Sequence, residues 1–120
     1  MQYLLLIYED ESYWQTMPPE QFAAEMKPWQ EYADWLREKG WYVGGQALQP
    51  TGDAVTVRER DGKTLRTDGP FAETKEQLGG YYLVECDDVD QAVEAASRIP
   101  SVGRGSIEVR PIMDFSQVPA

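Results

Sequence analysis

The sequence predicts an α+β domain with one antiparallel sheet that carries its helices on a single face. Three observations support this class: short runs of strand-forming residues, two segments with apolar residues at helical spacing, and an Asp-Gly turn between two strand-like runs. The chain of 120 residues fits a single domain, residues 1–120. We expect its core at about residues 1–112 and an irregular tail at residues 113–120.

The first predicted strand, Gln2–Glu9, is apolar on both of its faces. Its alternating side chains are Tyr3, Leu5 and Ile7 on one face and Leu4, Leu6 and Tyr8 on the other. A strand with one wet face would instead alternate apolar and polar residues. We therefore expect this strand to be covered on both sides, and we expect the acidic run after it, residues 9–11, to be a solvated loop.

A long helix is predicted from about Pro19 to Lys39. Its apolar stripe repeats at steps of four and three: Phe22, Met26, Trp29, Ala33 and Leu36. Proline is favoured at the first helical position, and Gly40 suits the end of the helix. Pro28 removes a backbone donor inside the helix, so we expect a kink there or two shorter helices.

The remaining elements are a strand, a hairpin, a strand, a helix and a last strand. The predicted ranges are Trp41–Leu48, the hairpin Ala54–Arg60 with Lys63–Thr67, Gly80–Cys86, Asp87–Pro100 and Ser106–Ile112. Asp61-Gly62 between two strands is a strong hairpin signal. Asp88 and Gln91 form a capping-box pattern at the start of the second helix. The inner stripe of that helix is predicted to be Val89, Ala92, Val93, Ala96 and Ile99.

This order is β-α-β-β-α-β with an extra hairpin strand, which is a ferredoxin-like arrangement. We expect both helices to cover the same face of the antiparallel sheet. The other face carries many apolar side chains and no element to cover it, and a large exposed apolar patch favours association. The sequence therefore predicts a homodimer in which two copies pack their uncovered sheet faces together.

Composition and charge exclude several classes of partner and cofactor. A net charge of −10 disfavours nucleic acid and anionic membranes. The first apolar run is too short to span a bilayer and lacks the features of a signal peptide, and one cysteine, Cys86, cannot form an intrachain disulfide. We therefore expect a cytoplasmic protein. The chain has no histidine, the usual ligand of catalytic zinc, and we expect no metal and no cofactor.

The segment Thr67–Gly80, TDGPFAETKEQLGG, joins two predicted strands. It contains Asp68-Gly69-Pro70-Phe71 followed by AETKEQLGG. Together with the opening MQYLLLIY, the segment GGQALQP and the closing IEVRP, it resembles the DGPF-type members of the YCII-related family. The resemblance covers about residues 1–112 and implies a ferredoxin-like subunit that pairs into a dimeric α/β barrel.

The same resemblance bears on activity. Related dimeric-barrel proteins include small enzymes that act on lactones and chlorinated aromatics, and better-studied YCII-type members have a His–Asp pair assigned to a cleft. This sequence has no histidine, so Asp68 is the only carboxylate of the motif that carries over. Genes of the DGPF type often lie beside extracytoplasmic-function sigma factors, which implies a sigma-factor association.

Asp68 is accordingly the candidate catalytic residue. Its carboxylate either shapes the loop by accepting backbone N–H bonds before Gly-Pro, or acts as a general base or ligand-orienting group at the mouth of a cleft. The loop-shaping interpretation is favoured, because a histidine partner for proton transfer is missing.

Six further residues are candidate ligand-binding positions, and each has a structural alternative. They are Tyr8, Gly45, Phe71, Lys75, Tyr82 and Arg110. The tyrosines belong to an apolar pocket or to the core and dimer interface. Gly45 makes room for a ligand or marks a bulge or a close helix crossing. Phe71 is expected in the core, Lys75 in solvent within reach of an anionic ligand, and Arg110 in a salt bridge rather than an anion clamp.

Two hypotheses on function follow. In the first, the protein is a cofactor-free enzyme that uses Asp68 in proton transfer on a small organic acid or lactone. In the second, it is a non-catalytic ligand-binding or regulatory accessory protein linked to a sigma-factor circuit. The sequence leaves open whether the protein is an enzyme.

Overall fold

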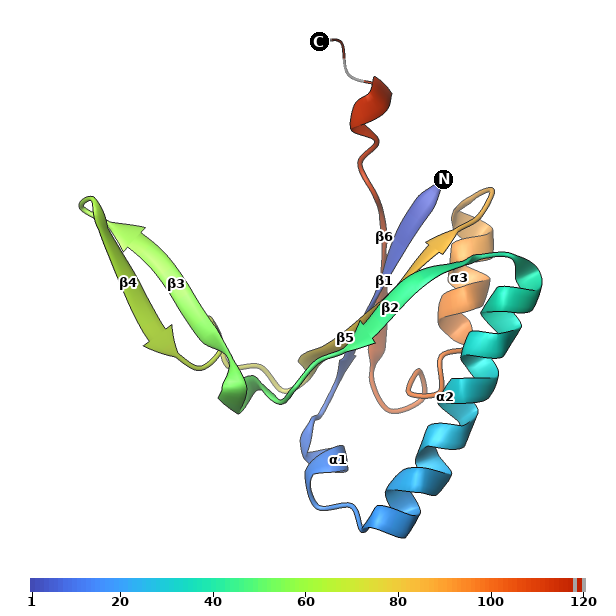
Figure 1. Ribbon diagram of the computed structural model, residues 1–120, viewed down its shortest axis with the longest axis horizontal. Coiled ribbons are helices and arrows are strands. Elements are labelled where there is room, and N and C mark those ends of the chain that lie inside the picture. Colours follow the sequence, from blue (N-terminus) through green and yellow to red (C-terminus); the bar gives the residue numbers. More distant parts are fainter. Residues whose placement is uncertain (118, 120) are drawn as a thin grey trace.

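The computed structural model describes residues 1–117 and 119, in which a four-stranded sheet, a separate two-stranded hairpin and three α-helices are found (Figure 1). The strands are β1 (Gln2–Glu9), β2 (Tyr42–Ala47), β3 (Val55–Arg60), β4 (Lys63–Asp68), β5 (Gln77–Glu85) and β6 (Ser106–Pro111). The helices are α1 (Ser12–Gln15), α2 (Pro19–Lys39) and α3 (Val89–Ser97), with 3-10 turns η1 (Thr51–Asp53) and η2 (Phe115–Gln117). The predicted α+β class and antiparallel sheet are confirmed. The predicted irregular tail contains η2, and residues 118 and 120 lie outside the described part.

The strands of the main sheet lie in the order β2-β5-β1-β6, and each neighbouring pair is antiparallel. β1 and β5 are therefore the central strands. Leu5 lies opposite Tyr82 on β5 and opposite Val109 on β6. Residues in direct register share a face of the sheet, and their chain neighbours point to the other face.

Helices α2 and α3 lie on the same face of the main sheet (Figure 1). Between this face and the helices lies the hydrophobic core: Tyr3, Leu5, Ile7, Tyr32, Leu36, Val84, Cys86, Ala92, Ala95, Ala96 and Ile99. The buried sheet residues alternate along β1 and β5, as expected when helices cover one side.

Helix α2 runs unbroken through Pro28, so the alternative of two shorter helices is wrong. Gly40 ends the helix as predicted, with a left-handed φ of 73° that glycine adopts without strain. The predicted stripe is only partly buried, because the N-terminal part of α2 extends past the sheet (Figure 1). Phe22 is 46% exposed there, whereas Leu36 is fully buried.

Helix α3 buries alanines rather than valines against the sheet. Val89 and Val93 are exposed, contrary to the prediction, and Ala95 is fully buried instead. A small alanine face lets the helix come close enough for the Tyr32 hydroxyl of α2 to donate to the Ala95 carbonyl at 2.8 Å. The predicted cap is present: the Asp88 side chain accepts the backbone N–H of Gln91 at 3.0 Å.

Strands β3 and β4 form a hairpin, here called the arm (residues 55–68), that projects away from the main sheet and its helices (Figure 1). Its two-residue turn is the predicted one, with positive φ at both Asp61 (53°) and Gly62 (76°). Every residue of β4 is exposed. The chain consequently spans 52 × 49 × 19 Å, a flat and open shape.

The face of the main sheet opposite α2 and α3 is here called the open sheet face. Its side chains are Leu4, Leu6, Tyr8, Tyr81, Leu83, Glu108 and Arg110. Among the described residues, no member of the buried core comes from this face. Leu4, Leu6 and Leu83 are half-buried by their neighbours in the sheet. β1 is thus apolar on both faces, as predicted, and the described chain buries only one of them.

Candidate functional site

Tyr8 and Arg110 lie on the open sheet face, at opposite ends of it. Tyr8 is opposite Ser106, and Arg110 is opposite Leu4. The Tyr8 hydroxyl donates to the Glu108 carboxylate at 3.4 Å. Glu108 lies on β6 between Ser106, the residue opposite Tyr8, and Arg110. These side chains give a polar margin to an otherwise apolar surface.

Gly45 and Tyr82 lie directly opposite each other on the helix-covered face. A Cβ atom on Gly45 would lie 2.8 Å from the Tyr82 ring and 2.9 Å from the Tyr81 carbonyl oxygen, so glycine is needed for this close approach. The Tyr82 ring meets Tyr32 edge-on, with ring centroids 5.1 Å apart. The close neighbours of Gly45 thus belong to strand β5 rather than to a helix, and the pairing of β2 with β5 has a register shift between Tyr42 and Gly44.

Tyr82 of β5 and Tyr32 of α2, which pack together, are poorly suited to proton transfer. Burial raises the pKa of Tyr82, the nearby Tyr42 adds to this rise, and Arg37 opposes it. Burial also raises the pKa of Tyr32, whose hydroxyl already donates to a backbone carbonyl. Both phenols therefore stay protonated at neutral pH and act as packing groups.

Asp68 closes the base of the arm rather than lining a cleft in the described chain. Its side chain is 89% exposed, and its carboxylate lies 3.9 Å from the guanidinium of Arg66. The next residue, Gly69, has a φ of 105°, its N–H donates to the Ala54 carbonyl at 2.6 Å, and its carbonyl accepts from the Thr56 hydroxyl at 2.8 Å. The Asp-Gly pair thus forms the turn that leads the chain out of the arm.

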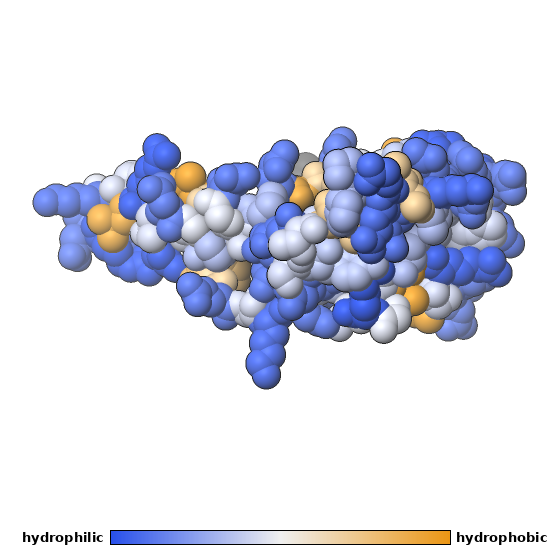
Figure 2. Space-filling view, turned by 90° about the horizontal axis from the view of Figure 1, so that it is seen from below, coloured by the Kyte–Doolittle hydropathy of each residue, from blue (hydrophilic) through white to orange (hydrophobic). Residues whose placement is uncertain are grey.

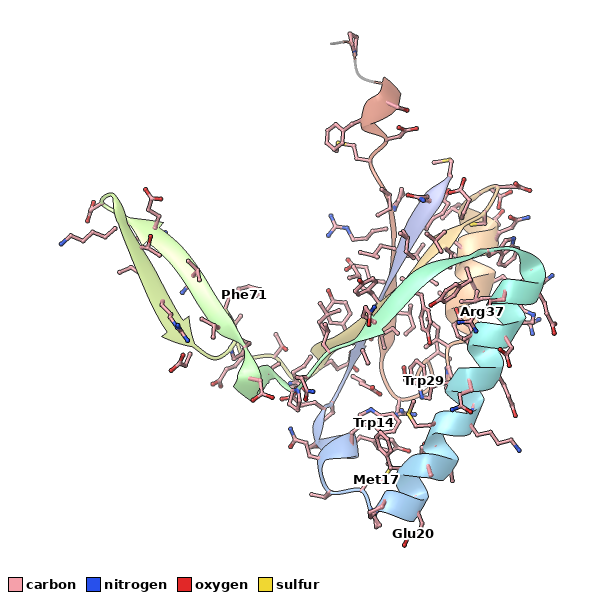
Figure 3. All side chains as sticks on the ribbon, viewed as in Figure 1. Trp14, Met17, Glu20, Trp29, Arg37 and Phe71 are labelled. Atoms are coloured by element: carbon pink, nitrogen blue, oxygen red, sulfur yellow. The ribbon has the colours of Figure 1, made fainter. Side chains whose placement is uncertain are left out.

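Phe71 and Lys75 lie in the connection from the arm to β5, and both are exposed. Phe71 is 79% exposed, so the prediction that it anchors the core is wrong for the single chain. Figure 3 places it beside the arm, far from Trp29 and Arg37 of α2. The arm's position explains the difference, because the connection runs outside the main sheet and its helices.

A buried ion pair lies where β1 ends. The Glu9 carboxylate accepts from the Trp14 indole N–H at 2.7 Å and lies 3.1 Å from Nε of Arg104, whose guanidinium stacks on the Tyr13 ring at 4.0 Å. Glu9 is only 7% exposed, so the expectation of a solvated acidic loop is wrong at this residue. A signal was present in the sequence: Glu9 continues the buried phase of β1 after Tyr3, Leu5 and Ile7.

Gly105 and Glu11 hold the loops around this ion pair in place. A Cβ atom on Gly105 would lie 2.2 Å from the Tyr8 carbonyl oxygen, so only glycine lets the loop after α3 reach β1. The Glu11 carboxylate accepts from both the N–H and the hydroxyl of Thr51, at 2.9 and 2.6 Å. These contacts fix α1, the loop after α3 and the start of η1 around the Glu9–Arg104 pair.

An open cleft of about 510 Å³ lies between α2 and the loop after α3. Its lining combines aromatic rings, two arginines and two glutamates: Glu25, Pro28, Glu31, Tyr32, Trp35, Arg98, Pro100 and Arg104. The Arg98 guanidinium lies 4.5 Å from the Trp35 ring centroid, a cation–π contact. An apolar wall beside guanidinium groups is suited to a small organic anion.

A smaller hollow of about 270 Å³ adjoins this cleft on the side of α1. It is lined by Asp10, Ser12, Tyr13 and Arg104, so Arg104 borders both spaces. The Tyr13 hydroxyl donates to Glu25 of the larger cleft at 3.0 Å. Trp14 and Met17 lie in the same region, between α1 and the start of α2 (Figure 3).

The remaining chemistry of the described residues is limited. Burial raises the pKa of the Cys86 thiol, which disfavours the reactive thiolate. Within residues 1–117 and 119, no group of three or more cysteine, aspartate or glutamate side chains could hold a metal ion. Over the same residues, no helix is both long and apolar enough to cross a membrane.

Comparison with known proteins gives the family. Residues 1–116 match the YCII-related domain. The chain is also 38% identical over 114 residues to the uncharacterized protein R00369 of Rhizobium meliloti (strain 1021), covering 93% of this chain and 92% of that protein. On this evidence, which extends over nearly the whole length, the chain belongs to the YCII-related family.

Proposed function

We propose that the protein is a cytoplasmic homodimer of the DGPF type that binds a small organic acid. In this proposal each subunit is ferredoxin-like, and two subunits pair through the open sheet face into a dimeric α/β barrel. The strand order β2-β5-β1-β6 with both helices on one face supports the subunit fold. The Asp68-Gly69-Pro70-Phe71 motif supports the subgroup.

The cleft beside α2 is the observation that supports ligand binding. Its volume of about 510 Å³ lies within the range of pockets for small organic molecules. Trp35 and Tyr32 supply apolar surface, and Arg98 supplies N–H donors for a carboxylate. Arg98 pairs only loosely with Glu94, at 3.7 Å on the protein surface, and its guanidinium lies against Trp35 in the wall of the cleft.

A pair of probes that differ in charge tests this function. Benzoate and the neutral benzamide are titrated into the ¹⁵N-labelled protein, and amide shifts in the loop at residues 98–104 are followed. We expect benzoate to bind there and benzamide to bind about tenfold more weakly, because only the carboxylate pairs with a guanidinium. The Arg98→Gln variant should lose about tenfold in benzoate affinity.

The matched control is Arg37→Gln, which removes an arginine of α2 that does not line the cleft. It should leave benzoate affinity unchanged. Equal binding of both probes, or equal benzoate affinity in Arg98→Gln and the unaltered protein, would contradict an organic-acid site in this cleft.

The proposal has two versions, which differ in whether Asp68 takes part in proton transfer. The non-catalytic version, including a role as accessory to a sigma-factor circuit, is supported by the absence of histidine and by the 89% exposure of the Asp68 side chain. A catalytic aspartate normally gains its reactivity from partial burial or a nearby charged group. Turnover of a lactone panel that falls about a hundredfold in Asp68→Asn, with benzoate binding retained, would favour the cofactor-free enzyme.

A further inference from the structure

We infer that the arm packs against the body of a second copy of this chain, the body being residues 1–54 and 69–117. This interaction surface rests on the proposed homodimer but is distinct from the open sheet face. The first reason is that, within the described chain, strands β3 and β4 of the arm pair only with each other. An isolated two-stranded hairpin is marginally stable in water at best.

The arm and its outgoing connection expose apolar side chains to solvent. Val57 is 63% exposed and Phe71 79%, and Val55 and Leu65 are nearly half exposed. Val55 and Val57 share one face of the hairpin and Leu65 lies on the other, so both faces carry apolar surface. Figure 2 shows the corresponding hydrophobic patches on the projecting part of the molecule. Such side chains are typical of a surface that is covered in the working assembly.

The dimensions of the chain point to the same missing contact. Its radius of gyration is 16.9 Å. A compact domain of this length has a radius of gyration of about 13.6 Å. The arm and the segment after β6 both project from the main sheet and its helices, which makes the chain more extended than a compact domain (Figure 1). In our inference the second copy lies beside the arm.

The charge of the arm complements the body. The arm has four basic residues, Arg58, Arg60, Lys63 and Arg66, and three acidic ones, Glu59, Asp61 and Asp68, for a net charge of +1. The whole chain carries −10, so the remaining residues carry −11. Two bodies repel each other, whereas an arm placed against the body of the other copy reduces that repulsion.

The base of the arm is held firmly, so the arm is not a loose loop. Glu11 binds Thr51 of η1 through two hydrogen bonds, and Gly69 bonds to both Ala54 and Thr56. The arm also connects β2 to β5, which are neighbours in the main sheet. It therefore leaves the body at the end of the main sheet where β2 ends and β5 begins.

Hydrogen exchange measured by mass spectrometry tests the inference directly. The unaltered protein is examined at concentrations above and below its dimer dissociation constant, with mass measured by sedimentation in the same samples. We expect the arm amides of residues 55–68 to exchange about a hundredfold more slowly in the dimer than in the diluted monomer. A dimer whose arm exchanges as fast as in the monomer would overturn the arm contact alone. A protein that stays monomeric at every concentration would overturn both the arm contact and the proposed dimer.

Two exposed valines provide a matched pair of variants. Val57→Asp on the arm should weaken dimerisation about tenfold or more, because the charge enters the contact with the second copy. Val93→Asp on the outer surface of α3, where the valine is 52% exposed, should leave dimerisation unchanged. Equal dimer affinities of the two variants would overturn the inference.

Discussion

At the scale of single residues, Glu9–Arg104 is the ion pair with the least exposed carboxylate among the described residues. Glu9 is 7% exposed, and Arg104 is the cation beside it, at 3.1 Å. A buried carboxylate that loses its cation is left uncompensated in a medium of low polarity, which destabilises the fold. The pair also joins the end of β1 to the loop beside the cleft, which Arg104 lines.

Removal of Arg104 is therefore expected to be severe. Arg104→Met should lower the free energy of unfolding by about 3–5 kcal/mol, because Glu9 stays buried without its partner. The double variant Glu9→Gln with Arg104→Met should be more stable than Arg104→Met alone, since a neutral amide replaces the unpaired charge. Urea unfolding followed by tryptophan fluorescence measures all of these values.

The control for this prediction is the exposed pair Arg98 and Glu94. Its atoms are 3.7 Å apart and its side chains are 55% and 42% exposed. Arg98→Met should lower the free energy of unfolding by less than about 1 kcal/mol. Similar losses in Arg98→Met and Arg104→Met would show that the buried pair has no special role.

At the scale of elements, local patterns predicted most of the strands and helices. The ranges of β1 and α2 agree with the prediction, since the first is a continuous apolar strand and the second has clear signals at both ends. The turn at Asp61 and the cap at Asp88 also agree, because each depends on residues next to each other in the chain. The short α1 was missed, as four residues are too few for helical periodicity to appear.

Features set by distant contacts could not be predicted in the same way. Hairpin signals at residues 54–67 say that two strands pair, but not whether the hairpin lies on the sheet or projects as an arm. The cleft depends on how α2 meets the loop holding Arg98 and Arg104, which lies far from it in sequence. The candidates Asp68, Tyr82 and Arg110 came from the motif and from alternation, and the structure places them at three separate locations.

The paired glycines of β2 offer a test of packing between elements. A Cβ atom on Gly45 would meet the Tyr82 ring at 2.8 Å, whereas one on Gly44 would meet nothing within 4 Å. Gly45→Ala should therefore lower the free energy of unfolding by about 1–3 kcal/mol through overpacking. Gly44→Ala should be neutral or stabilising by up to about 1 kcal/mol, because it restricts the unfolded chain. Thermal unfolding of the two variants side by side decides the matter, and equal stabilities would contradict the close packing at Gly45.

At the scale of the whole molecule, one subunit leaves two surfaces without cover. The open sheet face presents Leu4, Leu6 and Leu83, and the arm and its outgoing connection present Val57 and Phe71. The arm joins β2 to β5, which are adjacent strands of the main sheet. A second copy would cover both surfaces. In our account the proposed ligand cleft, which lies beside α2 on the helix side of the sheet, stays accessible in that dimer.

The mass of the protein in solution tests this account most directly. Sedimentation equilibrium over a wide range of concentrations should give twice the 13.7 kDa of one chain, and Leu4→Glu on the open sheet face should shift the protein to a folded single chain. A folded protein of 13.7 kDa at every concentration, with no change in Leu4→Glu, would contradict the account.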